Sequence, residues 1–367
     1  MDEFVEYLSE SKKALATTDF SKANVHIVMG NESCDLDSMI SALALAYFHN
    51  KQNLKTSKTT LVLPVLNILS VELLLRTENC FVLDELKIDK NSLIFRDTIN
   101  LEEIQKHGLL KLSIVDHHVL RDKDKFLQSS VVEVFDHRPK DTKAMWDSSK
   151  TYVNVAEVGS CATLVANEIL KRNPHVINES LGSLLYDVIT FDTIGFNPEA
   201  DKVKELDITV SKQLENIIEK KDAVKRYKEL WQAHNDVSHL SPKQLLSKDL
   251  KFINGLPIPG LPMLVRNYLN LPNVENHIES FCDEVDFTTV IIMGLSVIDN
   301  EVYRDIGIFA KGDKSLQNEL VTKLRDSEDF CLEECRVHVP NVVYFKQNNV
   351  KKSRKHLLPI LKTVLEK

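Results

Sequence analysis

The sequence has no long apolar run and few cysteines, and each shortage excludes a class of protein. No apolar stretch approaches the roughly 20 residues that a membrane-spanning helix requires. The six cysteines form no paired framework, which indicates reduced thiols rather than the disulfides of a small secreted protein. The N-terminus begins acidic and lacks the basic region of a secretory signal. We therefore expect a cytoplasmic protein without a membrane partner, while a mitochondrial pool stays open.

An excess of positive charge is also missing. The formal net charge is −8, from 46 Lys and Arg against 54 Asp and Glu. Because a general nucleic-acid-binding protein is more often basic, we expect no nucleic-acid partner, and a local basic site must hold any polyanion. A chain of 367 residues is too long for one simple core, so we expect two domains.

Short apolar strands alternate with helical patterns along the first half of the chain. This alternation predicts an α/β domain with a mostly parallel sheet flanked by helices. The strands are expected at Val25–Gly30, Thr60–Val65, Ser92–Phe95, Leu109–Val115, Val131–Phe135 and Thr151–Val155. The helices are expected at 2–16, Ser38–Asn50, from Gly159 to about Lys171, and over roughly Asp201–Lys221.

A charged stretch, Glu219–Glu229, separates this part from a second α/β pattern. We expect a first domain over 1–215, a helical linker over 216–237, and a smaller C-terminal domain over 238–367, with a cleft between the two domains. In the C-terminal domain the expected strands are Phe287–Val297, Glu301–Ala310 and Val342–Phe345. A helix is expected at Lys314–Arg325.

Acidic residues and histidines follow four apolar runs of the first domain. These runs are interpreted as strands, and ligands collect at the carboxyl ends of the strands in a parallel sheet. In chain order, the segments after the runs are NESCDLDS (31–38), Asp116-His117-His118, Asp136-His137-Arg138, and Asp192-Thr193 after Leu184–Phe191.

This set of side chains predicts a site for divalent metal ions. The spacing of Asp35 and Asp37 lets each carboxylate bind a different ion of a close pair, although such a short motif is equally typical of turn and helix-capping acids. Four acidic segments, two of them with histidine, are harder to ascribe to capping. Carboxylate and imidazole ligands suit Mn²⁺, Mg²⁺ or Co²⁺, and the absence of clustered cysteines argues against structural zinc.

The ordered motifs resemble the DHH phosphoesterase superfamily over almost the whole chain. The later segments KDLK (248–251) and SRKH (353–356) are similar to the phosphate-binding motifs of its C-terminal associated domain, found in manganese-dependent inorganic pyrophosphatases and cytosolic exopolyphosphatases. Within the superfamily, the chain resembles the prune family, whose third motif reads DHR instead of DHH. The stretches that carry this likeness are GNESCDLDSMISALALAYF, LPVLNI, LIFRDTI, VDHHVL, VFDHRP and VGSCATLV.

The resemblance implies two metal ions and a specific ligand set. Asp35 and Asp37 would each bind one ion, Asp116 would bridge both, and His137 and Asp192 would complete the second site. Asn31 stands where the pyrophosphatases have a metal-binding histidine. An amide oxygen is a poorer ligand than an imidazole, so this substitution weakens one site.

The resemblance also assigns residues that bind phosphate. Arg138 replaces a phosphate-facing histidine; an arginine can hold phosphate bidentately, but it does not titrate near pH 7. His117 and His118 either lie near the phosphate or support Asp116. In the C-terminal domain the implied clamp is Lys251, Arg354 and Lys355, with Lys248 a weaker candidate. Without the resemblance, the basic run 351–355 would be interpreted as a solvated helix end.

The segment Gly159-Ser160-Cys161 opens a helix and has two interpretations. Either its backbone amides bind an anion, as helix N-termini do, or the glycine allows close packing of strand and helix. We favour packing.

These assignments predict a metal-dependent phosphohydrolase, an enzyme in which a water activated by two ions attacks a terminal phosphorus. The resemblance implies short-chain polyphosphate as substrate, and for the prune family also cyclic nucleotides such as cAMP. Asn31 and Arg138 favour an alternative, a weakly active regulatory protein that acts through partners such as nucleoside diphosphate kinase. An oligonucleotide-cleaving relative ranks lower, because those proteins carry a Gly-rich loop and this chain has 10 Gly, no two adjacent.

Overall fold

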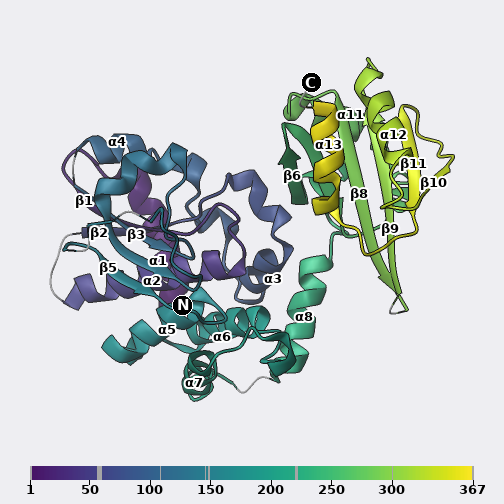
Figure 1. The fold of residues 1–367 in the computed structure, drawn as a ribbon. Coiled ribbons are helices and arrows are strands. Elements are labelled where there is room, and N and C mark those ends of the chain that lie inside the picture. The colour runs from purple at the N-terminus through teal and green to yellow at the C-terminus, as the bar shows by residue number, and fades with distance from the viewer. Residues whose placement is uncertain are drawn as a thin grey trace. The chain divides into compact units, whose positions relative to one another are not determined.

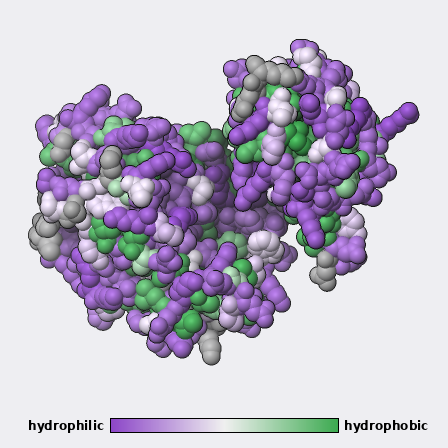
Figure 2. Space-filling view, in the orientation of Figure 1, coloured by the Kyte–Doolittle hydropathy of each residue, from purple (hydrophilic) through white to green (hydrophobic). Residues whose placement is uncertain are grey.

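The computed structural model describes residues 2–55, 60–107, 109–144, 146–147, 149–219, 222–299 and 301–365. These residues form two compact units, 1–234 and 235–367, each built on its own sheet (Figure 1). Hydrophilic residues cover most of the visible surface of each unit (Figure 2). In the described part of the chain, no helix combines the length and the apolar character needed to cross a membrane.

A parallel sheet forms the centre of the N-terminal unit, and its described strands follow the order β2-β1-β3-β4-β5. The strands are β1 (Asn24–Met29), β2 (Thr60–Val65), β3 (Leu110–Val115), β4 (Val131–Asp136) and β5 (Tyr152–Val155). They are strongly apolar because helices and loops cover both faces of the sheet. The parallel sheet predicted from the sequence is confirmed.

Apolar cores lie on both faces of this sheet. Successive side chains of a strand point to opposite faces, so Val28 joins a core with α1, α2, α5 and α6, whereas Ile27 joins a core with α4. The helices of this unit are α1 (Glu3–Thr17), α2 (Leu36–Lys55), α3 (Thr77–Glu85), α4 (Leu101–Lys106), α5 (Cys161–Arg172), α6 (Glu179–Asp192), α7 (Glu205–Leu214) and α8 (Ala223–Asn235). Short 3-10 helices connect them: η1 (Ser70–Leu75), η2 (Lys90–Ser92), η3 (Arg96–Thr98), η4 (Asp122–Ser130), η5 (Pro174–Val176) and η6 (Pro198–Ala200).

The C-terminal unit contains a mixed sheet, whose described strands follow the order β10-β11-β9-β8-β7-β6. Only β7 and β8 pair in parallel among them. The strands are β6 (Asp249–Ile253), β7 (Leu256–Leu261), β8 (Thr289–Ile298), β9 (Glu301–Ala310), β10 (Leu332–Cys335) and β11 (Val342–Gln347). The helices are α9 (Pro242–Lys248), α10 (Val265–Tyr268), α11 (Val274–Glu284), α12 (Ser315–Arg325), η7 (Arg354–Leu357) and α13 (Leu358–Leu365).

Two expected strands are not strands in the structure. The segment Ser92–Phe95 forms a single bridge, from Phe95 to Leu66, and its first residue ends η2. The run Leu184–Phe191 belongs to α6, which is capped by the Asn178 side chain. A short apolar run does not distinguish a buried helix from a buried strand, and here the capped helix of 14 residues buries the run. Asp192 therefore ends a helix.

The segment expected to be a linker carries α8, and this helix packs within the N-terminal unit. Arg226 and Leu230 of α8 are buried there. The helix expected over Asp201–Lys221 is shorter, since α7 covers Glu205–Leu214, and positions 220 and 221 lie outside the described residues.

Candidate metal centre

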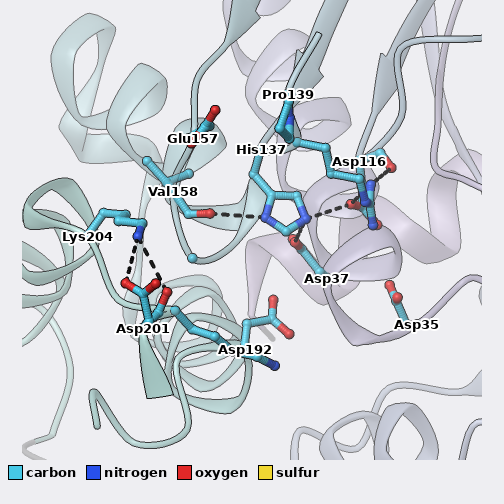
Figure 3. A pocket seen from close by; sticks show the side chains of 13 residues that line it. Asp35, Asp37, Asp116, His137, Pro139, Glu157, Val158, Asp192, Asp201 and Lys204 are labelled. Carbon is cyan, nitrogen blue, oxygen red and sulfur yellow. Dashed lines mark hydrogen bonds and ion pairs between the residues drawn. The ribbon is translucent and has the colours of Figure 1, made fainter. Parts of the chain in front are cut away.

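The acidic motifs meet at the carboxyl edge of the parallel sheet. Ligands of open α/β sheets bind at this edge where the strand order reverses, and β1 is such a point, with β2 on one side and β3 on the other. Asp35 and Asp37 follow β1, Asp116 follows β3, and His137 follows β4. A pocket of about 340 Å³ brings them together with Asp192 (Figure 3).

The backbone at two strand ends is specialised. A Cβ at Gly30 would meet the Oγ of Ser38 at 2.1 Å, so glycine is required where β1 approaches α2. Asp116 has a φ of 59°, in the left-handed region that aspartate tolerates better than most residues. Its N–H donates to the carbonyl of Phe135 at 2.8 Å, which ties the end of β3 to β4. Such strained positions cluster at functional sites.

His137 points one ring nitrogen toward two of the carboxylates (Figure 3). Its Nε2 is 3.4 Å from Asp116 Oδ1 and 4.0 Å from Asp37 Oδ2, while its Nδ1 donates to the carbonyl of Val158 at 3.2 Å. A carbonyl oxygen can only accept a hydrogen bond, so Nδ1 carries a hydrogen. The other ring nitrogen, Nε2, faces the carboxylates. Metal-ligating histidines are commonly oriented in this way by a backbone carbonyl. Asp37, Asp116 and His137 offer ligand atoms within 4.8 Å of one another.

The N-terminus of α5 holds Asp37. The N–H groups of Cys161 and Ala162 donate to its carboxylate at 2.6 and 2.8 Å. The backbone N–H groups of Cys161 and Ala162 therefore donate to a side chain of the protein and are not available to bind an external anion. A Cβ at Gly159 would meet Thr193 Cγ2 at 2.6 Å, so the packing interpretation of this glycine is confirmed.

The electrostatics of the pocket favour a bound cation. Burial and the charge of Asp37 raise the pKa of both Asp35 and Asp116, and burial with the charges of Asp37 and Asp35 raises the pKa of Asp192. Burial lowers the pKa of His137, but the hydrogen bond with Asp116 and the charge of Asp37 raise it to about 9 overall. The pKa values of the three carboxyl groups and of the imidazole are thus all raised, because burial and the surrounding negative charge favour the protonated forms of the acids, and the negative charge favours the protonated imidazole. A divalent cation would balance that charge.

One atom of the pocket also lacks a partner. Oδ2 of Asp192 is buried and makes no hydrogen bond with any residue of the described part of the chain. A buried carboxylate oxygen is costly to leave unpaired. Together with the oxygen-rich donor set, this atom fits a divalent metal ion such as Mn²⁺ or Mg²⁺.

Arg138 and Asn31 both contact Asp116. Nη1 of Arg138 donates to Asp116 Oδ1 at 2.8 Å and to its carbonyl at 2.6 Å, and the side chain is 47% exposed. Nδ2 of Asn31 donates to Asp116 Oδ2 at 2.7 Å, while its Oδ1 accepts hydrogen bonds from Ser33 and from the N–H of Cys34. The nitrogen of Asn31 therefore faces Asp116, and its oxygen closes the turn after β1.

His117 and His118 are held away from the carboxylates that line the metal pocket. Nδ1 of His117 donates to the carbonyl of Val115 at 2.9 Å. His118 pairs through Nδ1 with Asp136, and its Nε2 accepts from the N–H of Asp141 at 2.8 Å. Among the described residues that line the pocket, neither histidine appears. These contacts favour the interpretation in which both support the motif from behind.

Lys202 and Lys204 also line the pocket, and they are not among the residues expected from the sequence. Nζ of Lys204 is 3.4 Å from Asp201 Oδ1. Buried Asp207 anchors this loop, since it accepts from the N–H groups of Gly159 at 2.8 Å and Lys204 at 2.7 Å. An acid at the start of a helix is a capping signal, but its link to Gly159 is not readable from sequence.

In the C-terminal unit, Arg354 ties the SRKH segment to β6 and β7. Its Nη1 donates to the carbonyls of Asp249 and Ile258 at 2.6 and 2.8 Å, and its Nη2 lies 2.5 Å from Asp249 Oδ2. Lys251 follows Asp249 by two residues and so shares its face of β6. Lys251 and Lys355 are exposed. Two of the three expected clamp residues thus present their side chains to solvent, and Arg354 is engaged internally.

Comparisons with known proteins place the chain in a family. Residues 228–364 match the DHHA2 domain. The chain is 34% identical to exopolyphosphatase PRUNE1 of Mus musculus over 98% of its own length and 79% of the relative. It is 34% identical to exopolyphosphatase PRUNE1 of Homo sapiens over 93% and 76%. A putative family II inorganic pyrophosphatase of Methanococcus jannaschii shares the fold, with a TM-score of 0.50 and 17% identity over 93% of this chain and 100% of that one. This chain therefore belongs to the prune family of DHH phosphoesterases, with a DHHA2 domain at its C-terminal end.

Proposed function

We propose that this protein is a metal-dependent exopolyphosphatase that removes terminal phosphate from short-chain polyphosphate. The observation that carries the proposal is the pocket of Asp35, Asp37, Asp116 and Asp192 around His137, which has more negative than positive charge. The exopolyphosphatase names of the relatives support the substrate class. We propose two ions, Mn²⁺ or Mg²⁺ with Co²⁺ as an alternative. When bound, such ions lower the pKa of water and neutralise charge on phosphate oxygens.

The chain itself supplies the orientation of these ligands. The amides at the start of α5 hold Asp37, the carbonyl of Val158 fixes the His137 ring, and Asn31 steadies Asp116. In this assignment Asn31 positions a ligand and would itself bind metal only after turning its amide. His117 and His118 support the second and third motifs.

Cationic side chains bind the phosphate oxygens in this proposal. Lys251, Arg354 and Lys355 are the phosphate-binding residues proposed within the C-terminal unit. Arg138, Lys202 and Lys204 line the metal pocket. Their charges neutralise the developing charge on the transferred phosphate, as in other phosphoryl-transfer sites. The six cysteines are unpaired, in keeping with our placement of the enzyme in the reducing cytoplasm.

Removing both pocket lysines tests their role in substrate binding. In the double variant Lys202→Ala, Lys204→Ala we expect KM for triphosphate to rise by about tenfold or more, since a hydrogen bond to a charged group contributes roughly 1.5–3 kcal/mol. The measurement is steady-state phosphate release. Lys212→Ala, an exposed position on α7, is the matched control and should leave KM unchanged. An unaltered KM in the double variant would remove these lysines from the binding site.

A weakly active regulatory protein is a second candidate function. Arg138 favours it, because this side chain pairs with the acid proposed to bridge the metals and cannot act as a titrating group near pH 7. In this reading the protein acts through partners such as nucleoside diphosphate kinase. Cyclic nucleotides such as cAMP are the second substrate class to compare with polyphosphate in the same assay.

Arg138→His distinguishes the two candidates. If the arginine limits turnover, kcat for triphosphate should rise by about tenfold or more, because a positioned acid or base contributes roughly 10²- to 10⁴-fold. Arg138→Gln is the control, since it removes the same charge without adding a titrating group. A kcat that stays at the wild-type value, or that rises equally in both variants, argues against the explanation by lost acid–base chemistry.

A further inference from the structure

A second group of side chains of the types that bind metal ions lies on the α2 face of the parallel sheet. His26 of β1 and Glu133 of β4 each stand three residues before the end of their strand, about 10 Å from the carboxyl edge at roughly 3.3 Å per residue. His49 reaches them from α2. This group shares no residue with the carboxylate pocket described above.

The three side chains converge on one point. His26, His49 and Glu133 offer ligand atoms within 4.8 Å of one another. Nε2 of His49 is 2.6 Å from Glu133 Oε2, and the two imidazole rings lie 4.6 Å apart between centroids. Ser113 joins the set, because its Oγ is 2.7 Å from His26 Nε2 and donates to Glu133 Oε2 at 2.6 Å. Three residues that are far apart in sequence thus point their donor atoms at the same small volume.

We infer that His26, His49 and Glu133 form a second metal site, which takes a borderline transition-metal ion such as Zn²⁺. Two imidazoles and one carboxylate are a ligand set that zinc binds tetrahedrally, with the fourth position left to water. Mg²⁺ prefers oxygen ligands, so it should bind this set of two imidazoles and one carboxylate weakly. The group lines a cavity of about 400 Å³, which gives an ion a route of entry.

The surroundings favour a cation ligand set over an anion site. Lys111, Lys150 and Arg172 also line the cavity, but the carboxylate of Glu133 lies beside His49 and would repel an anion. Lys150 pairs with Asp147 at 3.3 Å. Arg172 is already engaged, with an ion pair to Glu168 at 3.2 Å and a stacked contact with the Phe48 ring.

An ion at this point would join three elements of the N-terminal unit. It would cross-link β1, β4 and α2, the helix whose first turn carries Asp37. An ion that binds the folded chain but not the unfolded one stabilises the fold, and the stabilisation grows with the logarithm of the ratio of ion concentration to Kd. The unfolding temperature therefore rises as the ion is added. The expected signature is therefore both an added binding equivalent and a thermal shift.

The test is Zn²⁺ binding by the full chain, measured by competition with a chromophoric chelator and by thermal unfolding. Wild type should bind one Zn²⁺ per chain more than His49→Ala and Glu133→Gln, and Zn²⁺ should raise its unfolding temperature by several degrees more than theirs. His107→Ala is the matched control, because that imidazole pairs with Glu103 at 3.4 Å on the surface. It should match wild type in both readouts.

The opposite result is equally clear. If wild type, His49→Ala and Glu133→Gln bind the same number of Zn²⁺ ions with the same thermal shift, the group is a hydrogen-bonded network and the inference is wrong. Glu133→Gln keeps the size of the side chain, so it decides the matter if His49→Ala fails to fold. The result does not depend on the hydrolytic activity proposed for the carboxylate pocket.

Discussion

Replacing Asp116 with asparagine should abolish phosphate release and most metal binding. The carboxylate is 1% exposed and contacts His137, Arg138 and Asn31, so the substitution keeps the shape of the site and removes its charge. Loss of a residue behind a metal ligand typically costs roughly 10- to 100-fold in affinity or activity. Loss of the ligand that we propose to bridge the two ions should cost more, so we expect activity below one hundredth of wild type.

The measurements are phosphate release from triphosphate and calorimetric titration with Mn²⁺. Asp201→Asn is the matched control, since this carboxylate lines the same pocket but its side chain is 98% exposed. The control should keep both activity and metal affinity near wild type. An Asp116→Asn enzyme with wild-type activity and Mn²⁺ affinity would show that the carboxylate pocket is not the catalytic centre.

Arg226→Ala should destabilise the N-terminal unit by about 3–5 kcal/mol, the range for breaking a buried ion pair. Arg226 is 6% exposed, and its guanidinium joins α8 to Asp187 of α6 at 2.7 Å and to Glu85 of α3 at 3.1 Å. Its removal leaves a buried negative charge at Asp187 without the positive charge that balances it.

Chemical denaturation of the full chain measures this effect. Lys225→Ala is the matched control one residue away, because its ion pair with Glu229 is long, at 3.8 Å, and its side chain is 77% exposed. An exposed pair of this kind contributes roughly 0.2–1 kcal/mol at most. If both variants unfold at the same denaturant concentration, the stability of the N-terminal unit does not depend on the Arg226 network, and α8 behaves as the helical linker expected from sequence.

The parallel sheet and the chain order of the site were predictable because their signals are local. Each strand is a short apolar run, and each acidic motif follows directly after its run, as Asp116 follows Leu112–Val115. Parallel pairing then brings the strand ends to one edge without further information. The family resemblance added proposed roles for single residues, such as a metal-bridging role for Asp116.

Other features depend on contacts that sequence does not encode locally. The helix α6 was interpreted as a strand because the mostly apolar run Leu184–Phe191 fits either structure when buried. Strand β7 reads LPIPGL, and prolines usually argue against an internal strand. Lys202 and Lys204 reach the pocket because Asp207 fastens their loop to Gly159, 48 residues earlier in the chain. The pairing of Arg138 with Asp116 likewise follows only from the folded arrangement.

The most direct test of the account is phosphate release by metal-free protein to which Mn²⁺ or Mg²⁺ is added back. The substrates are triphosphate, tetraphosphate, pyrophosphate and cAMP. We expect release from the short polyphosphates that depends strictly on added metal and is lost in Asp116→Asn. Release that persists without metal, or no release from any substrate while metal binds, would contradict the proposal of a metal-dependent exopolyphosphatase.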